Sequence, residues 1–225
     1  LSKRFCSKMF QRPTETPVRE TKKELRRSGW VARVKAAKRQ IQEKKMMMAQ
    51  ERKAGQTPEE ELEQWWKRLC VAYERLVPIA EEYGVKLAMH PSDTPNPDAP
   101  LGGLGLHRLI DAFPSRSVGY LYCCGTRAEA GGSALILDEI HHYGRKGRIF
   151  HVHFRNVRGS LPTAGGFEEV LLDDGDMNMF KILLELKRVG FEGCLNPDHV
   201  PHLEGDGPDA GQGLAYSVGY IKALF

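Results

Sequence analysis

The chain has 225 residues, of which 41% are hydrophobic and 28% charged, so it can bury the core of an ordinary domain. It contains no run of about 18 apolar residues, and we therefore expect no membrane span. Five cysteines, an odd number without the spacing of a disulfide framework, favour a reducing compartment such as the cytoplasm. The first residue is Leu1 rather than methionine, so we expect a fragment or a processed product.

The net charge of +4 conceals two unlike segments. Residues 1–55 hold 17 of the 33 basic residues but only 5 of the 29 acidic ones. We expect residues 1–56 to be a basic helical or partly disordered extension, and a solvated helix is the simplest interpretation. Binding of nucleic acid or anionic lipid is the alternative, and the basic, acid-poor start also resembles a transit peptide. The segment lacks interleaved aromatic residues, so nucleic acid is the least favoured partner.

A helix is predicted to begin at Thr57. Pro58 suits the first helical position, and Glu60 completes a capping box with Thr57. Apolar residues then recur at helical spacing until Gly84 ends the helix. Pro78 is expected to kink or restart it.

Four strand–helix units follow. Together with the helix that begins at Thr57, they make up the second predicted domain, residues 57–225. The expected strands cover residues 85–90, 117–125, 148–157 and 193–200. The expected helices cover residues 106–113, 134–143, 177–189 and 214–224. Strands that alternate with helices indicate a parallel sheet and an α/β fold. Cys123 lies 33 residues after His90 and His153 lies 30 after Cys123, which is close to the repeat of about 31 residues in a (β/α)8 barrel.

Each predicted strand ends in a residue that can bind a metal ion. These residues are His90, Cys123, His153 and Asp198. Since neighbouring parallel strands lie about 4.8 Å apart, inward side chains at one rim can converge on a single ion. Two imidazoles, a thiolate and a carboxylate form a mixed set that favours Mn²⁺ or Fe²⁺, with Zn²⁺ or Co²⁺ as alternatives.

Each of these residues also has a structural interpretation. A histidine at a strand end is often only hydrogen-bonded, a buried cysteine often packs as a small apolar residue, and Asp198 can cap a turn. Cys124 competes with Cys123 because strand boundaries are uncertain by about two residues. The occurrence of one candidate per unit, at matching ends, favours the shared site.

Several segments, in order, resemble the mannonate dehydratase family of xylose-isomerase-like barrels. The segments are KLAMHPSDTP, YLYCCGTRAEAGG, RIFHVHFRNVRG, GGFEEVLLDDGDMNM, NPDHVPHLEGD and GLAYSVGYIKALF. The resemblance runs from about Gln64 to Phe225. It implies that the chain is the C-terminal half of a (β/α)8 TIM barrel, with the family's metal ligands on the four residues above. Such a half barrel would form a homo-oligomer or pair with the missing half to cover its strand edges.

The family dehydrates D-mannonate to 2-dehydro-3-deoxy-D-gluconate in hexuronate catabolism, so the resemblance implies a hydro-lyase with a sugar-acid substrate. His199 matches the family's catalytic histidine. The family's acid–base tyrosine corresponds to Gln212, and Tyr216, one turn further, is the candidate substitute. Asp93 matches an acidic substrate contact.

Arg155 and Asn156 are the candidates for binding the substrate carboxylate and hydroxyls. An internal ion pair is the alternative role for Arg155. Two other functions stay open for the whole chain. One is sugar isomerisation or epimerisation on the same metal site, and the other is an inactive fragment whose basic arm binds a partner.

Overall fold

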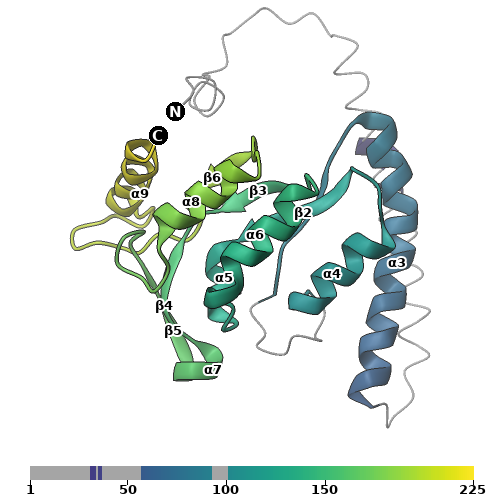
Figure 1. The fold of residues 1–225 in the computed structure, drawn as a ribbon, viewed down its shortest axis with the longest axis horizontal. Coiled ribbons are helices and arrows are strands. Elements are labelled where there is room, and N and C mark those ends of the chain that lie inside the picture. The colour runs from purple at the N-terminus through teal and green to yellow at the C-terminus, as the bar shows by residue number, and fades with distance from the viewer. Residues whose placement is uncertain (1–30, 34, 37–56, 93–100) are drawn as a thin grey trace, which may run out of the picture. The chain divides into compact units, whose positions relative to one another are not determined.

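A computed structural model describes residues 31–33, 35–36, 57–92 and 101–225 (Figure 1). Contacts divide these residues into two units. One contains residues 88–92, 101–110 and 119–225, and the other contains residues 57–87 and 111–118 with the described residues before them. Most of the predicted extension, residues 1–56, lies outside the described residues, as does Asp93. No helix in the described ranges is long and apolar enough to cross a membrane.

The first long helix is α3, Pro58–Tyr83, and its start confirms the predicted capping box. The Thr57 hydroxyl accepts a hydrogen bond from the Glu60 backbone N–H at 3.3 Å, and the Glu60 carboxylate accepts one from the Thr57 N–H at 3.0 Å. Gly84 ends the helix in the left-handed conformation, with φ of 63°. The expected restart at Pro78 is wrong, because a single helix continues across this residue.

The sheet has four strands, which are β1 Leu87–Met89, β2 Val118–Cys123, β3 Ile149–His153 and β6 Cys194–Asn196. They lie in the order β1-β2-β3-β6, and the pairs β2–β3 and β3–β6 are parallel. The predicted α/β class with a parallel sheet is therefore confirmed. In the β2–β3 register Cys123 lies opposite His153, so both residues end at the same rim.

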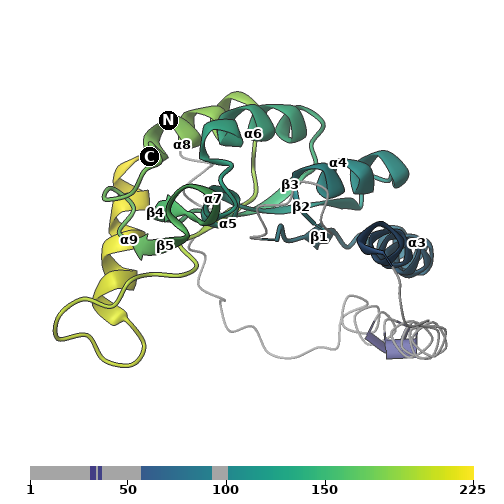
Figure 2. The ribbon, with the colours of Figure 1, turned by 90° about the horizontal axis from the view of Figure 1, so that it is seen from below.

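Helices follow the strands as predicted, with shifted ends. They are α4 Gly103–Ala112, α5 Cys124–Glu129, the 3₁₀ turn η1 Ser133–Leu135, α6 Ile136–Arg145, α8 Met179–Arg188 and α9 Gly211–Ala223. Helices α6 and α8 lie side by side along one face of β2 and β3 (Figure 2). Tyr122, Ile140, Val152 and Leu186 are almost fully buried between these elements. The strand predicted over residues 117–125 ends at Cys123, and the chain continues directly into the short helix α5, which Cys123 caps.

An antiparallel hairpin interrupts the third unit, with β4 Asn156–Ser160, the short helix α7 Leu161–Ala164 at its tip and β5 Gly166–Val170 (Figure 1). The single strand predicted over residues 148–157 is wrong, because β3 ends at His153 and the chain enters β4 three residues later. Gly165 reverses the chain before β5 with φ of 69°. The hairpin places β5 residues within reach of the rim of the sheet.

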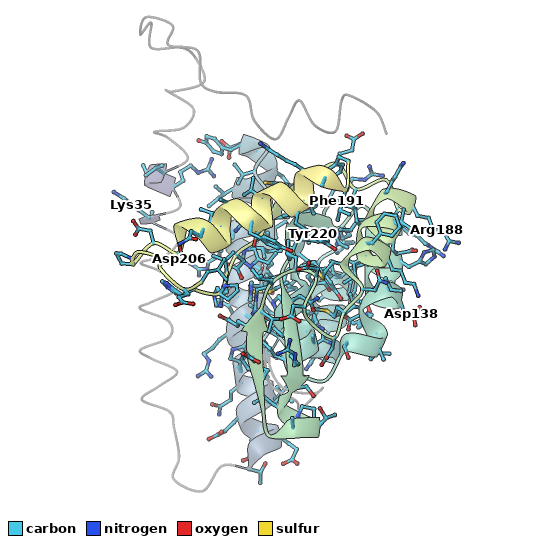
Figure 3. The ribbon with its side chains drawn as sticks, turned by 90° about the vertical axis from the view of Figure 1, so that its left-hand side faces the viewer. Lys35, Asp138, Arg188, Phe191, Asp206 and Tyr220 are labelled. Carbon is cyan, nitrogen blue, oxygen red and sulfur yellow. The ribbon has the colours of Figure 1, made fainter. Side chains whose placement is uncertain are left out.

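Helix α9 closes the described fold. Figure 3 shows α9 with Tyr220 on it and Asp206 in the segment before its first turn. The Asp206 carboxylate accepts hydrogen bonds from the backbone N–H groups of Gln212 and Gly213, at 2.7 and 3.3 Å. A carboxylate in that position satisfies donors that a helix start leaves unpaired. Gln212 is thereby held through its backbone in the first turn of α9.

Candidate metal centre

Three of the four predicted metal-binding residues come together at one rim of the sheet. The candidate donor atoms of His90, Cys123 and His153 all lie within 4.8 Å of one another. Cys123 and His153 are the last residues of β2 and β3, and His90 follows β1 directly. We call these three residues the His–Cys–His group. Their convergence follows from the strand order, because β2 lies between β1 and β3.

Asp198 lies beside this group and reaches it from the loop after β6. Its Oδ2 atom is 3.0 Å from His153 Nδ1 and 3.2 Å from Arg155 Nε. The backbone of Asp198 has φ of 58°, a left-handed conformation that is uncommon outside glycine, although aspartate is among the residues that tolerate it best. In this left-handed conformation the Asp198 carboxylate lies beside His153.

Cys123 is the electrostatic centre of the group. Its side chain is fully buried, and burial alone would raise its pKa. Hydrogen bonds from His153 and His90, the charge of Arg155 and the Thr126 N–H at 3.4 Å outweigh burial and lower the pKa of Cys123 to about 5. A thiolate is therefore its form at neutral pH, which is the form that binds metal ions.

The other cysteine candidate, Cys124, has the opposite character. Burial raises the pKa of its thiol well above the ordinary value, and the charge of Cys123 raises it further. Cys124 lies in the apolar core cluster with Tyr122 and Val152. The geometry therefore favours Cys123, and not Cys124, as the metal-binding thiol.

His90 is oriented by its own neighbour in the chain. Its Nδ1 atom lies 2.6 Å from the Pro91 carbonyl oxygen, so Nδ1–H donates to that oxygen and Nε2 is left to bind a ligand. The hydrogen bond with Cys123 raises the pKa of His90, against the lowering effect of burial. His90 and His153 have their ring centroids 5.3 Å apart, so the two imidazoles flank one small space.

The donor set suits a divalent cation. His153 Nδ1 is buried without a hydrogen-bond partner of acceptable geometry, although the Asp198 oxygen is only 3.0 Å away. A buried polar atom without a partner costs free energy that a bound ion would recover. Two imidazoles, a thiolate and a carboxylate are all established ligands of transition metals. The residues present therefore fit the metal expected from the sequence.

Arg155 is buried behind the metal group, with 4% of its surface exposed. Its Nη1 atom lies 2.5 Å from Glu129 Oε1, and its Nη2 atom donates to the Thr126 hydroxyl at 3.0 Å. These contacts raise the pKa of Arg155 above its ordinary value despite burial. The structure thus contains the internal ion pair, which was the alternative to a substrate contact. Burial also raises the pKa of the Glu129 carboxyl, against the lowering effect of Arg155.

His199 is exposed and bonded to the hairpin. Its Nδ1 atom lies 2.5 Å from Glu169 Oε1 on β5, and this hydrogen bond raises the pKa of His199. Its Nε2 atom is 3.9 Å from the Asp198 carboxylate. The Glu169 carboxylate is also 3.6 Å from Arg155 Nη1. Glu129 and Glu169 were not predicted as functional residues, and the acidic pair within GGFEEV was the only signal in the sequence for Glu169.

Two predicted site residues have other roles in the structure. The Asn156 amide makes four hydrogen bonds to backbone groups of Val157, Leu172 and Met177, so its side chain has no polar atom left for substrate. Asn156 thus holds the hairpin to the following loop, and its contact with substrate stays a prediction. The Tyr216 hydroxyl donates to Asp173 at 2.6 Å, and within the described ranges no hydrogen bond joins it to the His–Cys–His group.

Comparison with known proteins identifies the family of this chain. The D-mannonate dehydratase (UxuA) family model matches residues 19–225. "Mannonate dehydratase 2" of Halalkalibacterium halodurans is 31% identical over 171 residues, which are 72% of this chain and 49% of that protein. The mannonate dehydratase of Geobacillus thermodenitrificans is 32% identical over 162 residues, 68% of this chain and 43% of that protein. The chain thus spans about half the length of the curated relatives it matches.

Solved structures extend the comparison to the fold. The mannonate dehydratase of Streptococcus suis matches with a TM-score of 0.61 and 26% identity over 76% of this chain and 56% of that one. A xylose isomerase domain protein of Planctomyces limnophilus matches with a TM-score of 0.54 and 14% identity over 76% and 54%, which shows a shared fold alone. The partial match to such barrels confirms the predicted architecture. Because the family model matches most of the chain, this chain belongs to the D-mannonate dehydratase family.

Proposed function

We propose that this chain carries the metal centre of a hydro-lyase that converts D-mannonate to 2-dehydro-3-deoxy-D-gluconate and water, in the breakdown of glucuronate. The observation that carries the proposal is the convergence of the three donor atoms within 4.8 Å, with Asp198 3.0 Å from His153. We infer Mn²⁺ or Fe²⁺ as the ion, since a mixed nitrogen, sulfur and oxygen set with open positions suits these metals. When bound, the ion would polarise the carboxylate and hydroxyl oxygens of a sugar acid.

The dehydration removes a proton from the carbon beside the carboxylate and a hydroxide from the next carbon, and the resulting enol becomes the 2-keto acid. In this proposal His199 accepts the proton, because its bond to Glu169 orients the imidazole and makes it a stronger base. Tyr216 is the proposed proton donor to the departing hydroxide. Its hydrogen bond to Asp173 raises the pKa of its hydroxyl and keeps it protonated at neutral pH.

Asp93 is proposed as a substrate contact, although it lies outside the described residues. Direct contact of substrate with Arg155 is not favoured, since its guanidinium is engaged with Glu129 and Thr126. Cys123, Cys124 and Cys194 are free thiols, which favours a reducing compartment, and we therefore propose the cytoplasm. A homo-oligomer, or association with the rest of a barrel, is proposed to cover the edges of the sheet.

The experiment is to load the purified chain with Mn²⁺ and to measure formation of a 2-keto-3-deoxy acid from D-mannonate. The expected result is product in the loaded protein and none after chelation. A panel of aldo- and keto-sugars tested in parallel separates the proposal from isomerisation or epimerisation at the same metal site. Turnover of a sugar but not of D-mannonate, or no turnover of any compound by metal-loaded protein, would contradict the proposal.

A further inference from the structure

A buried ion pair lies directly behind the proposed metal centre and no role has been assigned to its acidic member. Glu129 ends α5 and is 3% exposed, and Arg155, between β3 and β4, is 4% exposed. Burying two charges is costly unless each is well paired, and removing one partner leaves the other as an uncompensated buried charge. Two of the three guanidinium nitrogens of Arg155 have partners. Nη1 lies 2.5 Å from Glu129 Oε1, and Nη2 donates to the Thr126 hydroxyl at 3.0 Å.

The third guanidinium nitrogen, Arg155 Nε, lies beside Asp198. Arg155 Nε is 3.2 Å from the same Asp198 oxygen that lies 3.0 Å from His153 Nδ1. Both nitrogens are buried and neither has a hydrogen-bond partner of acceptable geometry. The Asp198 oxygen therefore lies between Arg155 Nε and His153 Nδ1 without a well-formed hydrogen bond to either nitrogen. A metal ligand in that situation needs its neighbours fixed if it is to stay in place.

We propose that Glu129 is a positioning residue for the metal centre: acting through Arg155, it holds the Asp198 carboxylate beside His153. This inference rests on the metal centre of the proposed function, but not on the reaction. Glu129 neutralises the guanidinium and restrains it, so that Arg155 steadies Asp198 and does not draw it away from the ion. Without Glu129, the buried guanidinium would turn to its remaining acidic neighbours, Asp198 and Glu169 at 3.6 Å.

Gly125 supports this packing independently. A Cβ atom at this position would meet the Arg155 guanidinium carbon at 2.5 Å, which is closer than real Cβ contacts allow. The chain therefore has no side chain at the point where the guanidinium crosses α5. The guanidinium is confined by shape as well as by charge.

The test is a metal titration of the full chain and needs no substrate. Co²⁺ is the probe, because its charge-transfer absorption with a thiolate reports contact with Cys123, and calorimetric titration with Mn²⁺ gives a second affinity. We expect Glu129→Gln to weaken binding of both ions by about 10- to 100-fold, the usual effect of losing a partner behind a metal ligand. Thr126→Val, which removes only the hydroxyl bonded to Arg155 Nη2, should weaken binding in the same direction.

The matched control is another buried Arg–Glu pair that starts on the same helix. Arg127 Nη2 lies 2.6 Å from Glu139 Oε1, with 6% and 10% of the two side chains exposed. Glu139→Gln should cost folding stability and leave both affinities within about twofold of wild type. This control separates loss of a buried charge in general from loss of the charge behind Asp198.

A double-mutant cycle shows whether Glu129 acts through Asp198. In the Asp198→Asn background, Glu129→Gln should change the affinity by no more than about twofold, the usual error of additivity. The inference is overturned if folded Glu129→Gln and Thr126→Val proteins bind both ions as wild type does, or if the Glu129 effect persists undiminished without the Asp198 carboxylate. A wild-type chain that binds neither ion overturns the inference and the metal centre together. A chain that binds metal but does not dehydrate D-mannonate contradicts the proposed function alone.

Discussion

Cys123 and His153 are direct partners in the parallel pair β2–β3, and each is the last residue of its strand. A parallel register brings residues at equal depth to the same rim, so one thiol and one imidazole meet there without help from a loop. His90 and Asp198 need additional turns of the backbone to join them. The β2–β3 register is thus the part of the site that the sheet itself determines.

The first prediction concerns the titration of Cys123. The difference in ultraviolet thiolate absorbance between the metal-free wild type and Cys123→Ser should show one step with a pKa of about 5. The folded-state pKa lies below the ordinary value of 9.0, so the contribution of this thiolate to stability is full above pH 9 and is lost as the pH falls through about 5. Cys124→Ser is the control and should leave the acidic step in place, since burial raises the pKa of Cys124.

The second prediction concerns the pair His199 and Glu169. Glu169→Gln should lower the pKa of His199 toward its ordinary value of 6.5, as measured by NMR titration of the imidazole, because the largest cause of its raised pKa is lost. The interaction that raises the pKa of His199 stabilises the fold at pH values below the unfolded-state pKa. This contribution is lost as the pH rises through the folded-state pKa. In the proposed reaction, His199→Asn should reduce kcat/KM by about 10²- to 10⁴-fold.

Glu168→Gln is the matched control for that experiment. Glu168 is the neighbour of Glu169 on β5, but it pairs with Arg158 at 3.0 Å on the exposed side of the hairpin. This variant should leave the titration of His199 unchanged. Equal shifts in the two variants would show that the surface charge of the hairpin, and not the hydrogen bond, sets the pKa of His199.

The third prediction tests the close packing of α5 on Arg155. Gly125→Ala should lower the free energy of unfolding by about 1–3 kcal/mol, because the added methyl group overlaps the guanidinium. Gly219→Ala on α9 has open space at its Cβ and should stabilise the chain by about 0.5–1 kcal/mol, since alanine loses less entropy in a helix. Chemical denaturation of both variants measures the contrast. A neutral Gly125→Ala would mean that Arg155 can move without cost.

The fourth prediction concerns the role of Asn156 in the fold. Asn156→Ala removes four buried hydrogen bonds and should lower the free energy of unfolding by at least about 2 kcal/mol. Arg158 lies on the same strand as Asn156 and forms exposed ion pairs with Glu168 and Asp174. Arg158→Ala should lower the free energy of unfolding by less than about 1 kcal/mol. If Asn156→Ala is as stable as Arg158→Ala but loses substrate affinity, Asn156 contacts the ligand after all.

The sequence predicted the sheet residues of the site because the composition of the strands and the spacing of the units are local signals. Cys123 and His153 meet at one rim of the sheet as expected, although both strands end earlier than predicted, and the four units appear in the expected order. Arg155 falls within the longer strand predicted over residues 148–157. The strand stops two residues earlier, where the Phe154 N–H bonds to the Asn196 carbonyl and the chain leaves the sheet for β4.

Contacts between distant acidic residues and the site had no comparable signal. Glu129 meets Arg155 across 26 residues of sequence, and Glu169 meets His199 across 30. Both pairings depend on where α5 and the hairpin pack. The spacing of apolar residues in the sequence does not predict that packing. The segment between Gly159 and Asp176 folds as part of an antiparallel hairpin, which Asn156 anchors through three hydrogen bonds to the distant backbone groups of Leu172 and Met177.

The hairpin β4–β5 belongs to a sheet of its own, whereas the His–Cys–His group stands at the ends of the parallel strands. Glu169, which orients His199, is therefore carried on a module separate from the metal-binding rim. Under the proposed function, substitutions in that module would change proton transfer by His199 and leave the metal-binding residues in place.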